Sequence, residues 1–332
     1  MGKLSNRELK ELLSCIKKDS RVVIPPMIGY DAGVHKVDGK YLVVGSDPCT
    51  GVPEEWFGYL LINYAASDVA LSGAKPEFCT INLLGPRGCA AEVFQKIMKQ
   101  TCQAADELSI AIVRGHTGTY DGLKELVGVA TVYGTAQLEK LITAGNAKPG
   151  DLILCTKPLG LETVTNFSLT QKKLAQKLFG GEQQEKLSNQ VRTQSCVHEA
   201  LELAKTGAVH AMHDATEGGF VSALNELAGA SMVGFRVDWE KIPVSKEVLA
   251  LQTYYDLSRW QVLSMSSTGT VLAAVDPQSQ QKVTSALSPM GVAAYFIGKL
   301  TESKKHLLVS FGKEEPFPNV PNDPYSLIVS GK

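Results

Sequence analysis

Residues 56–76, WFGYLLINYAASDVALSGAKP, contain an apolar stretch with helical spacing that carries a single carboxylate. The spacing predicts a helix through residue 72, and Gly73 with the following Pro76 marks its end. Asp68 lies inside this predicted helix among alanines. Because small neighbours allow close packing, the stretch predicts a carboxylate presented from a tightly packed helix.

Three further aspartates also lie in segments rich in glycine or small residues. They are Asp31 in GYDAG, Asp47 in GSDPCTG and Asp214 in HDATEGG. Taken singly, each has an ordinary interpretation as the cap of a helix or a turn. Asp31 and Asp47 stand before and after the predicted strand 41–45, so a turn between two strands would bring both to the same end of a sheet.

The aspartates at 31, 47 and 68 are interpreted as one cluster. Three converging carboxylates repel one another unless a cation lies between them. Mg²⁺ is bound by one or two protein carboxylates and leaves its other positions to water and phosphate. The set therefore predicts a Mg²⁺ site made by Asp31, Asp47 and Asp68, with Asp47 and Asp68 also close to a bound nucleotide.

Length and composition predict a soluble protein of two domains. The 332 residues exceed one average domain, and the turn Lys148–Asp151 suggests domains at 1–150 and 151–332. A net charge of −1 provides no basic excess for binding nucleic acid or a membrane surface. No apolar run approaches the roughly 18 residues of a transmembrane helix, and the first residues lack a signal-peptide core. The seven scattered cysteines contain no C-x-x-C pair, which indicates free thiols in the cytoplasm.

Gly115-His-Thr-Gly118 follows the predicted strand 110–114 and is a candidate phosphate-binding segment. Glycines there allow backbone N–H groups to approach phosphate oxygens, and Thr117 adds a hydroxyl donor. The chain has neither a G-x-x-x-x-G-K-[ST] P-loop nor a G-x-G-x-x-G motif. Gly115, His116 and Thr117 are therefore predicted to bind the cofactor, and a purely structural role for His116 is equally compatible with the pattern.

His213-Asp-Ala-Thr-Glu-Gly-Gly219 precedes a predicted helix, 219–230, whose N-terminus favours an anion. His213, Asp214 and Glu217 together could be zinc ligands. The paired glycines and the missing third neutral ligand favour Mg²⁺-phosphate chemistry instead. We interpret these three side chains as the candidate catalytic residues.

Four other segments have weaker patterns. Ser5-Asn-Arg-Glu8 is a capping box for a helix to about residue 18. The polar, lysine-rich stretch 169–194 predicts an exposed helical excursion, and 264–275 predicts a glycine-punctuated strand. The tail, 313–332, holds four of the fifteen prolines and is expected to be an irregular wrap or a flexible end.

Together these segments resemble the AIR synthase (PurM-like) superfamily, whose motifs they follow in order over nearly the whole chain. The matched motifs are G-x-D-A-A-V at 29–34, N-D-[LIV]-A-x-x-G-A-x-P at 67–76, G-[DH]-[TS] at 115–117, H-D-x-T-x-G-G at 213–219 and I-G-x-[LIV]-T at 297–301. The resemblance implies an α+β, PurM-like fold. Its N-terminal α/β domain would bind ATP and form a homodimer through its sheet, followed by a C-terminal α+β sandwich. It also implies that ATP and Mg²⁺ bind between the domains, with Asp31, Asp47 and Asp68 near the metal.

Within the superfamily, the 213–219 motif and the linker before residue 151 are most similar to the hydrogenase maturation factor HypE and its relatives. Family members use ATP to phosphorylate an oxygen or a selenide. The C-terminal acceptor cysteine of HypE has no counterpart after Cys196, and residues 21–30 lack the Cys and Lys of selenophosphate synthetase. The resemblance therefore implies a Mg-ATP-dependent, HypE-like enzyme that phosphorylates an amide, carbonyl or acid oxygen of a small-molecule or protein substrate. The alternatives are a small-molecule kinase of the thiamine-monophosphate kinase type and a maturation factor that binds ATP without turnover.

Overall fold

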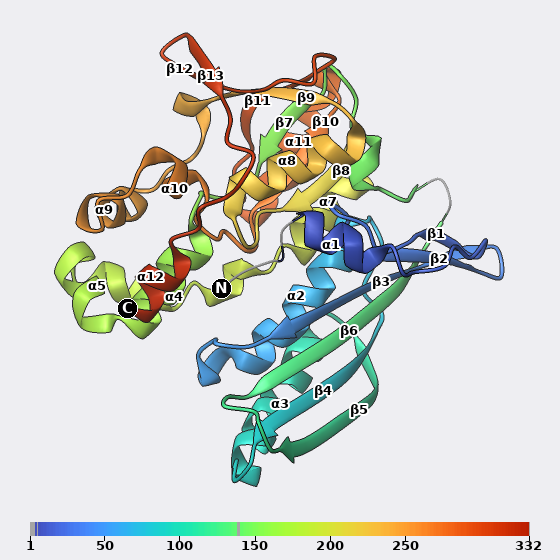
Figure 1. Ribbon diagram of the computed structural model, residues 1–332, viewed down its shortest axis with the longest axis vertical. Helices are drawn as coiled ribbons and strands as arrows, with labels where there is room; N and C mark the ends of the chain where they lie inside the picture. Colours follow the sequence, from blue (N-terminus) through green and yellow to red (C-terminus); the bar gives the residue numbers. More distant parts are fainter. Residues whose placement is uncertain (1–3, 5, 138–139, 332) are drawn as a thin grey trace. The chain divides into compact units, whose positions relative to one another are not determined.

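The computed structural model describes residues 4, 6–137 and 140–331, which form two compact units with one β-sheet each (Figure 1). The smaller unit comprises Lys18–Pro26 and Asp31–Leu141. The larger unit comprises Met1–Lys17, Met27–Tyr30 and Ile142–Lys332. Both units combine helices with largely antiparallel sheets, which confirms the predicted α+β class.

The smaller unit is built on a six-stranded sheet. Its strands, in spatial order, are β1 (Val22–Ile24), β2 (Gly33–Val37), β3 (Lys40–Cys49), β6 (Val127–Ala136), β4 (Phe78–Pro86) and β5 (Ala111–Tyr120). Only β4 and β5 pair in parallel, and the other neighbours are antiparallel. β5 is therefore an edge strand, three positions away from β3.

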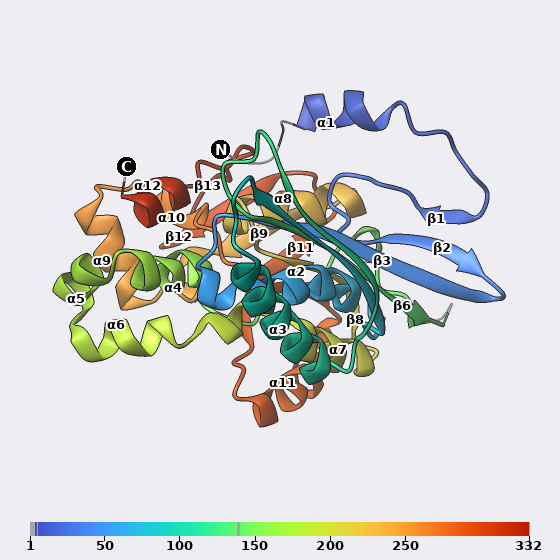
Figure 2. The same cartoon turned by 90° about the horizontal axis from the view of Figure 1, so that it is seen from below.

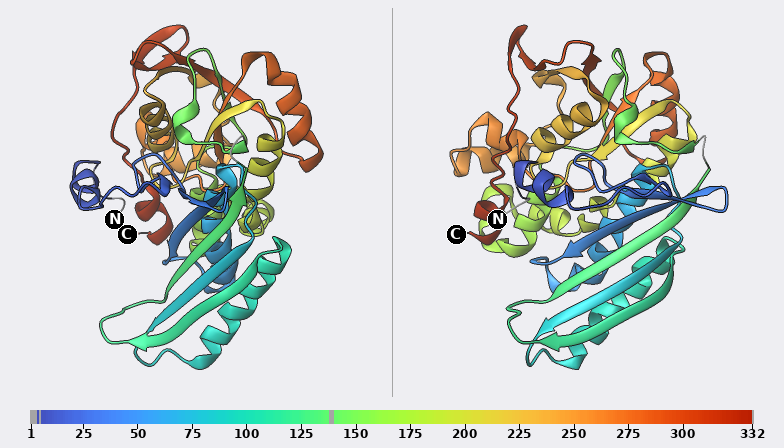
Figure 3. Two further views of the ribbon diagram at one scale, coloured as in Figure 1. Left: turned by 90° about the vertical axis from the view of Figure 1, so that its right-hand side faces the viewer. Right: turned by 45° about the vertical axis from the view of Figure 1, so that its right-hand side comes forward.

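Two helices, α2 (Phe57–Leu71) and α3 (Ala91–Glu107), cover one face of this sheet (Figure 3). The helix predicted from residue 56 to residue 72 is confirmed by α2. A Cβ on Gly58 would lie 2.5 Å from the Ile97 carbonyl oxygen, so the glycine allows α3 to cross α2 closely. Because α2 lies between the sheet and α3, nearly all of its residues are buried.

Among the described residues of the smaller unit, no helix lies on the opposite face of the sheet (Figure 2). Burial alternates along β6, where residues 128, 130, 132 and 134 are buried and the residues between them are only partly buried. This period of two is that of a strand with one covered face. The outer face carries Tyr133, whose ring stacks on Phe78 with centroids 5.6 Å apart.

The larger unit is built on a seven-stranded sheet. Its strands, in spatial order, are β13 (Lys313–Pro316), β12 (His306–Ser310), β9 (Gly234–Asp238), β11 (Tyr295–Thr301), β7 (Leu152–Cys155), β10 (Val271–Val275) and β8 (Val209–Asp214). β12 and β9 pair in parallel, and the other neighbours are antiparallel. Phe167, Phe220 and Phe235 are fully buried in its core.

Ten α-helices belong to the described part of the larger unit. They are α1 (Asn6–Leu13), α4 (Leu161–Thr170), α5 (Lys172–Phe179), α6 (Gly181–Ser188), α7 (Val197–Lys205), α8 (Gly219–Ser231), α9 (Lys246–Tyr254), α10 (Arg259–Leu263), α11 (Gln280–Leu287) and α12 (Tyr325–Ser330). Ser5, the expected cap of α1, lies outside the described residues. The predicted helical excursion contains α5 and α6, but each buries an inner face, through Ala175 and Leu187. No described helix is long and apolar enough to cross a bilayer.

The end of the chain differs from the expectation of an irregular or flexible tail. It contains β13, which pairs with β12, and α12, which packs against α4. Ile328 is fully buried in the core of the larger unit. Because this segment supplies both strand pairing and an apolar anchor, it is an ordered part of the fold.

Candidate functional site

Asp68 is held against the middle of β3 by a close contact between a helix and a strand. A Cβ on Gly45 would lie 2.7 Å from the Asp68 Cβ and 2.7 Å from the Ala65 carbonyl oxygen. No side chain fits in that space, so the glycine is what allows α2 to rest on the strand. The Asp68 side chain is buried there, with Oδ2 at 3.2 Å from the position of the missing Cβ.

Asp47 lies on the same face of β3 as Gly45. Val43, Gly45 and Cys49 are buried on the face that α2 covers, and strand alternation adds Asp47 to this row. Alternate strand residues are about 7 Å apart. The structure therefore brings Asp47 and Asp68 to one face of the sheet, which agrees with the predicted convergence of these two carboxylates.

The expectation that Asp47 follows the end of its strand is wrong, because β3 continues to Cys49. The reason is non-local: β6 pairs with β3 along its whole length, and Asp47 lies opposite Ala130. Proline has no backbone N–H to donate to a neighbouring strand. Pro48 is still accommodated in β3, because β2 pairs with β3 only as far as Val44 and needs no hydrogen bond from position 48. No local pattern in GSDPC signals this partner.

Asp31 stands two residues before β2. Gly33 pairs with Val44, and continuing that antiparallel register would place Asp31 beside Ser46, the neighbour of Asp47. The three aspartates predicted to bind metal thus come from consecutive pieces of the smaller unit: the residues just before β2, then β3, then α2.

Gly115, His116 and Thr117 lie within β5 and not in a loop after a strand. β5 pairs with β4 as far as Tyr120, and His116 Nε2 lies 2.5 Å from the Tyr120 hydroxyl. A Cβ on Gly115 would lie 2.8 Å from the Ile81 carbonyl oxygen, so this glycine serves strand packing. Three strand spacings separate β5 from β3, about 14 Å. Within one chain, the segment is therefore not adjacent to Asp47 and Asp68.

His213 lies at the end of β8 with both ring nitrogens engaged. Nδ1 lies 2.8 Å from the Asp214 carbonyl oxygen, and Nε2 lies 3.0 Å from Oε2 of Glu226 on α8. A carbonyl oxygen and a carboxylate only accept hydrogen bonds, so either the ring is an imidazolium or Glu226 carries the proton. Glu226 fixes the ring orientation, and the sequence analysis missed it because it lies two helical turns beyond the motif.

Asp214 and Glu217 have opposite environments. Asp214 is buried and pairs with Val271 of β10, whereas Glu217 is exposed in the turn before α8. Gly218 and Gly219 both have positive φ, 79° and 52°. A Cβ on Gly219 would lie 2.3 Å from the Met265 carbonyl oxygen, so the paired glycines form a turn that packs tightly on its neighbour.

That neighbour is the segment 264–270, which was expected to be the first part of a strand. It is a buried connection before β10, and two backbone hydrogen bonds join it to Ala215, the residue that follows β8. Ser267 N donates to the Ala215 carbonyl (2.8 Å), and Ala215 N donates to the Thr270 carbonyl (2.9 Å). The Thr163 hydroxyl donates to the Ser266 carbonyl (3.0 Å), which fixes the start of α4 beside the same segment.

Glu162, in the first turn of α4, is a candidate that sequence reasoning missed. Burial raises the pKa of its carboxyl to about 7, against a hydrogen bond from the Thr268 hydroxyl, which lowers it. The charges of Asp323 and Glu217 raise the pKa further. A carboxyl group with a pKa near neutrality is suited to proton transfer.

Comparison with known proteins identifies the family. The AIR synthase-related N-terminal domain matches residues 29–136, and the AIR synthase-related C-terminal domain matches residues 148–309. The chain therefore belongs to the AIR synthase-related family, as its motifs predicted. All nine residues proposed from sequence lie inside these matched ranges.

Curated relatives of the chain have several different activities in their names. A putative hydrogenase expression/formation protein of Methanocaldococcus jannaschii is 28% identical over 76% of this chain and 72% of its own length. The carbamoyl dehydratase HypE of Rhizobium leguminosarum is 26% identical over 86% of this chain and 81% of its own. The selenide, water dikinase of Myxococcus xanthus is 27% identical over 91% and 92%.

Solved structures have the same fold. Hydrogenase maturation protein HypE in complex with ATP has a TM-score of 0.71 and 18% identity, and the match covers 97% of this chain and 94% of that one. The PurM-like fold expected from the motifs is thus confirmed.

Proposed function

We propose that this protein is a Mg²⁺- and ATP-dependent phosphoryl-transfer enzyme of the HypE-like type. Its acceptor is an amide, carbonyl or acid oxygen of a small molecule or a protein. The observation that carries the proposal is the gap at Gly45, which seats Asp68 on the face of β3 that also carries Asp47. The ATP complex of HypE, which has the same fold, supports the choice of nucleotide.

The residues of the smaller unit fit a Mg²⁺ ion. Carboxylate oxygens are the ligands that this hard cation prefers, and its remaining positions are left to water and phosphate. Asp31, Asp47 and Asp68 would hold the ion. Bound Mg-ATP supplies the phosphoryl group that turns a poor leaving oxygen into a good one.

Other residues of the proposed site act on the nucleotide and the acceptor. Gly115, His116 and Thr117, which are separated from β3, are candidates for the far end of the nucleotide. In the larger unit, His213 and Asp214 orient the acceptor, with Glu226 holding the His213 ring in place.

Two exposed or partly buried carboxylates complete the acceptor side. Glu217 faces solvent in the turn before α8. Glu162 exchanges a proton near neutral pH, because its pKa is about 7.

We also infer functional domains at 1–150 and 151–332, and a homodimer formed through the smaller unit.

The first test compares Mg-ATP binding by the full-length protein and by Asp68→Asn, using calorimetry with Mg²⁺ or with EDTA. We expect Mg²⁺-dependent binding in the unchanged protein. In Asp68→Asn we expect a loss of roughly tenfold or more, because tenfold corresponds to 1.4 kcal/mol, within the strength of one hydrogen bond to a charged group. Phosphate release is then followed with ATP alone and with small amides and carboxylic acids.

Asp38→Asn is the matched control for this experiment. Asp38 lies in the exposed turn between β2 and β3 with φ of 45°, a conformation that asparagine also adopts. This variant should bind Mg-ATP normally. Unchanged affinity in Asp68→Asn would remove the metal assignment, and tight binding without phosphate release for any acceptor would identify a non-catalytic ATP-binding factor instead.

A further inference from the structure

His210 is the extra residue of a β-bulge at the edge of the larger sheet. β8 is the last strand in the order of that sheet, and its register against β10 steps from Ala211 to Val209 and passes over His210. A bulge re-aims the side chain of its extra residue, and bulges are frequent at sheet edges and next to functional sites. The imidazole of His210 is therefore turned out of the regular alternation of the strand.

A buried carboxylate orients the His210 ring. Nδ1 lies 2.9 Å from Oδ2 and 3.0 Å from Oδ1 of Asp151, which is buried. Asp151 directly precedes β7, and its backbone carbonyl accepts a hydrogen bond from Leu300 N of β11 at 2.8 Å. Its Oδ2 also accepts from Lys148 N at 2.8 Å. The carboxylate is thus fixed both by the sheet and by the turn before it, and a group held in this way keeps its partner in one orientation.

An exposed lysine approaches the other nitrogen of the same ring. Lys148 Nζ lies 3.4 Å from His210 Nε2, and the His210 side chain is 26% exposed. A carboxylate only accepts hydrogen bonds and an ammonium only donates them. Nδ1 therefore carries the ring proton, which it donates to Asp151, and Nε2 presents its lone pair towards Lys148. We call His210, Asp151 and Lys148 the His210 cluster.

The His210 cluster lies apart from His213. The two histidines are three positions apart in β8, about 10 Å along the strand. Glu226 of α8 holds the His213 ring, whereas Asp151 holds the other. The residues proposed to orient the acceptor therefore do not include this cluster.

The cluster has the three parts that a phosphoryl acceptor needs. A ring nitrogen with a free lone pair is a nucleophile, and a carboxylate at the opposite nitrogen stabilises the positive charge that the ring gains on attack. Lys148 adds a cation that can bind phosphoryl oxygens. A neutral acyl group would gain nothing from that cation, so the cluster favours an anionic electrophile.

We propose that His210 is a phosphorylation site and that the donor is an acyl phosphate. Nε2 attacks the phosphorus, and the Nε2–P bond forms as the bond from phosphorus to the acyl oxygen breaks. The carboxylate leaves with that electron pair, and the proton on Nδ1 stays in its hydrogen bond to Asp151. Because a carboxylate leaves as an anion, the step needs no proton donor. This inference goes beyond the proposed function and does not depend on it.

The test treats the full-length protein with acetyl phosphate at neutral pH, without nucleotide. We expect a single phosphoryl group on His210, located by mass spectrometry of peptides, stable in alkali and lost in acid, as is usual for a bond between phosphorus and a ring nitrogen. His210→Gln should abolish this label. His198→Gln is the matched control, because His198 is exposed on α7, and it should leave the label unchanged.

Two further positions separate orientation of the ring from binding of the donor. Asp151→Asn keeps one acceptor oxygen but removes the charge, so the maximal rate of labelling should fall roughly tenfold or more, which corresponds to 1.4 kcal/mol. Lys148→Gln should raise the half-saturating concentration of acetyl phosphate by roughly tenfold. Lys148→Arg keeps the positive charge and should restore it. A purely structural role would change neither quantity.

Several outcomes would overturn the proposal. They are label on residues other than His210, acetylation of Lys148 in place of phosphorylation, and labelling of His210 with unchanged rate and half-saturation in both Asp151→Asn and Lys148→Gln. Circular dichroism checks the fold of each variant. Because the Lys148 side chain is exposed, Lys148→Gln decides the matter even if Asp151→Asn fails to fold.

Discussion

At the scale of single residues, Gly45 decides how closely α2 approaches β3. Gly45→Ala would place a Cβ 2.7 Å from the Ala65 carbonyl oxygen, which belongs to a helix backbone that cannot move alone. We expect a loss of about 1–3 kcal/mol in the free energy of unfolding, the usual range for overpacking a tight contact. Urea unfolding measures it. Mg-ATP affinity should fall as well, since Asp68 moves with the helix.

Gly229→Ala is the matched glycine control for this prediction. Gly229 is exposed in α8, and a Cβ there would meet nothing within 4 Å. Alanine should stabilise the helix at this position by about 0.5–1 kcal/mol. If both variants shifted stability in the same direction, the close contact at Gly45 would not be the cause.

At the scale of secondary-structure elements, local periodicity predicted a helix correctly but ended two strands too early. The spacing of apolar residues between positions 56 and 72 predicted α2. The same reasoning ended β3 before Asp47 and ended the next strand before Gly115. Both strands continue because distant partners, β6 and β4, supply hydrogen bonds that no local pattern encodes.

The residues of the candidate site also include some that the sequence predicted and some that it missed. The motif residues, such as His213 and Asp214, were found because they stand in short glycine-rich segments. Glu162, Glu226 and Asp323 were missed because each reaches the site from an element with no such motif. Their chemistry comes from burial and from partners 13 to 106 residues away in the chain, which only the folded structure reveals.

Ionisation of Glu162, at the start of α4, should have a measurable effect on the free energy of unfolding. The pKa of Glu162 rises from 4.5 to about 7 on folding, so the folded protein binds more protons between these values. The stabilising contribution is therefore fully present below pH 4.5 and is lost as the pH rises through about 7. Glu162→Gln, which stays neutral, should gain stability relative to the unchanged protein at pH 8 more than at pH 5, measured by urea unfolding.

Glu302→Gln is the control for this pH dependence, because Glu302 is exposed. Its unfolding free energy should follow that of the unchanged protein at both pH values. A Glu162→Gln curve parallel to the unchanged protein across this range would show that Glu162 does not titrate as its surroundings predict.

At the scale of the whole molecule, we expect the proposed homodimer to form through the outer face of the smaller sheet. It carries Val44, Phe78, Val129 and Tyr133, and Phe78 is 42% exposed. Apolar patches of this kind mark interaction surfaces. A second copy of the same sheet would present the same patch, which is what a two-fold symmetric dimer requires.

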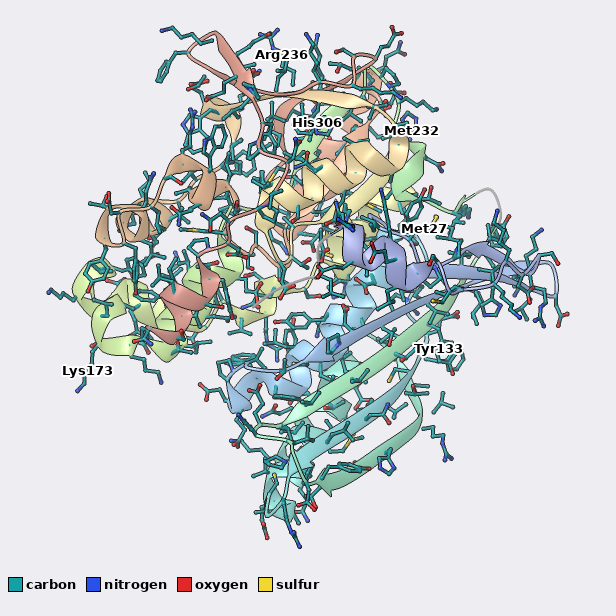
Figure 4. All side chains as sticks on the ribbon, viewed as in Figure 1. Met27, Tyr133, Lys173, Met232, Arg236 and His306 are labelled. Atoms are coloured by element: carbon teal, nitrogen blue, oxygen red, sulfur yellow. The ribbon has the colours of Figure 1, made fainter. Side chains whose placement is uncertain are left out.

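Tyr133→Asp tests this dimer, because it places a charge at the stacked Phe78–Tyr133 pair, and Tyr133 projects from the sheet (Figure 4). Light scattering should give twice the chain mass of 35.7 kDa for the unchanged protein and a single chain mass for the variant. Lys173→Glu changes an exposed residue of α5, also labelled in Figure 4, and should leave the dimer intact. A variant that stays dimeric, with normal circular dichroism, would place the dimer contact elsewhere. A charge buried at a dimer contact costs several kcal/mol. The Tyr133→Asp dimer should therefore dissociate at least in part at micromolar protein concentration, and a smaller effect would contradict the proposal.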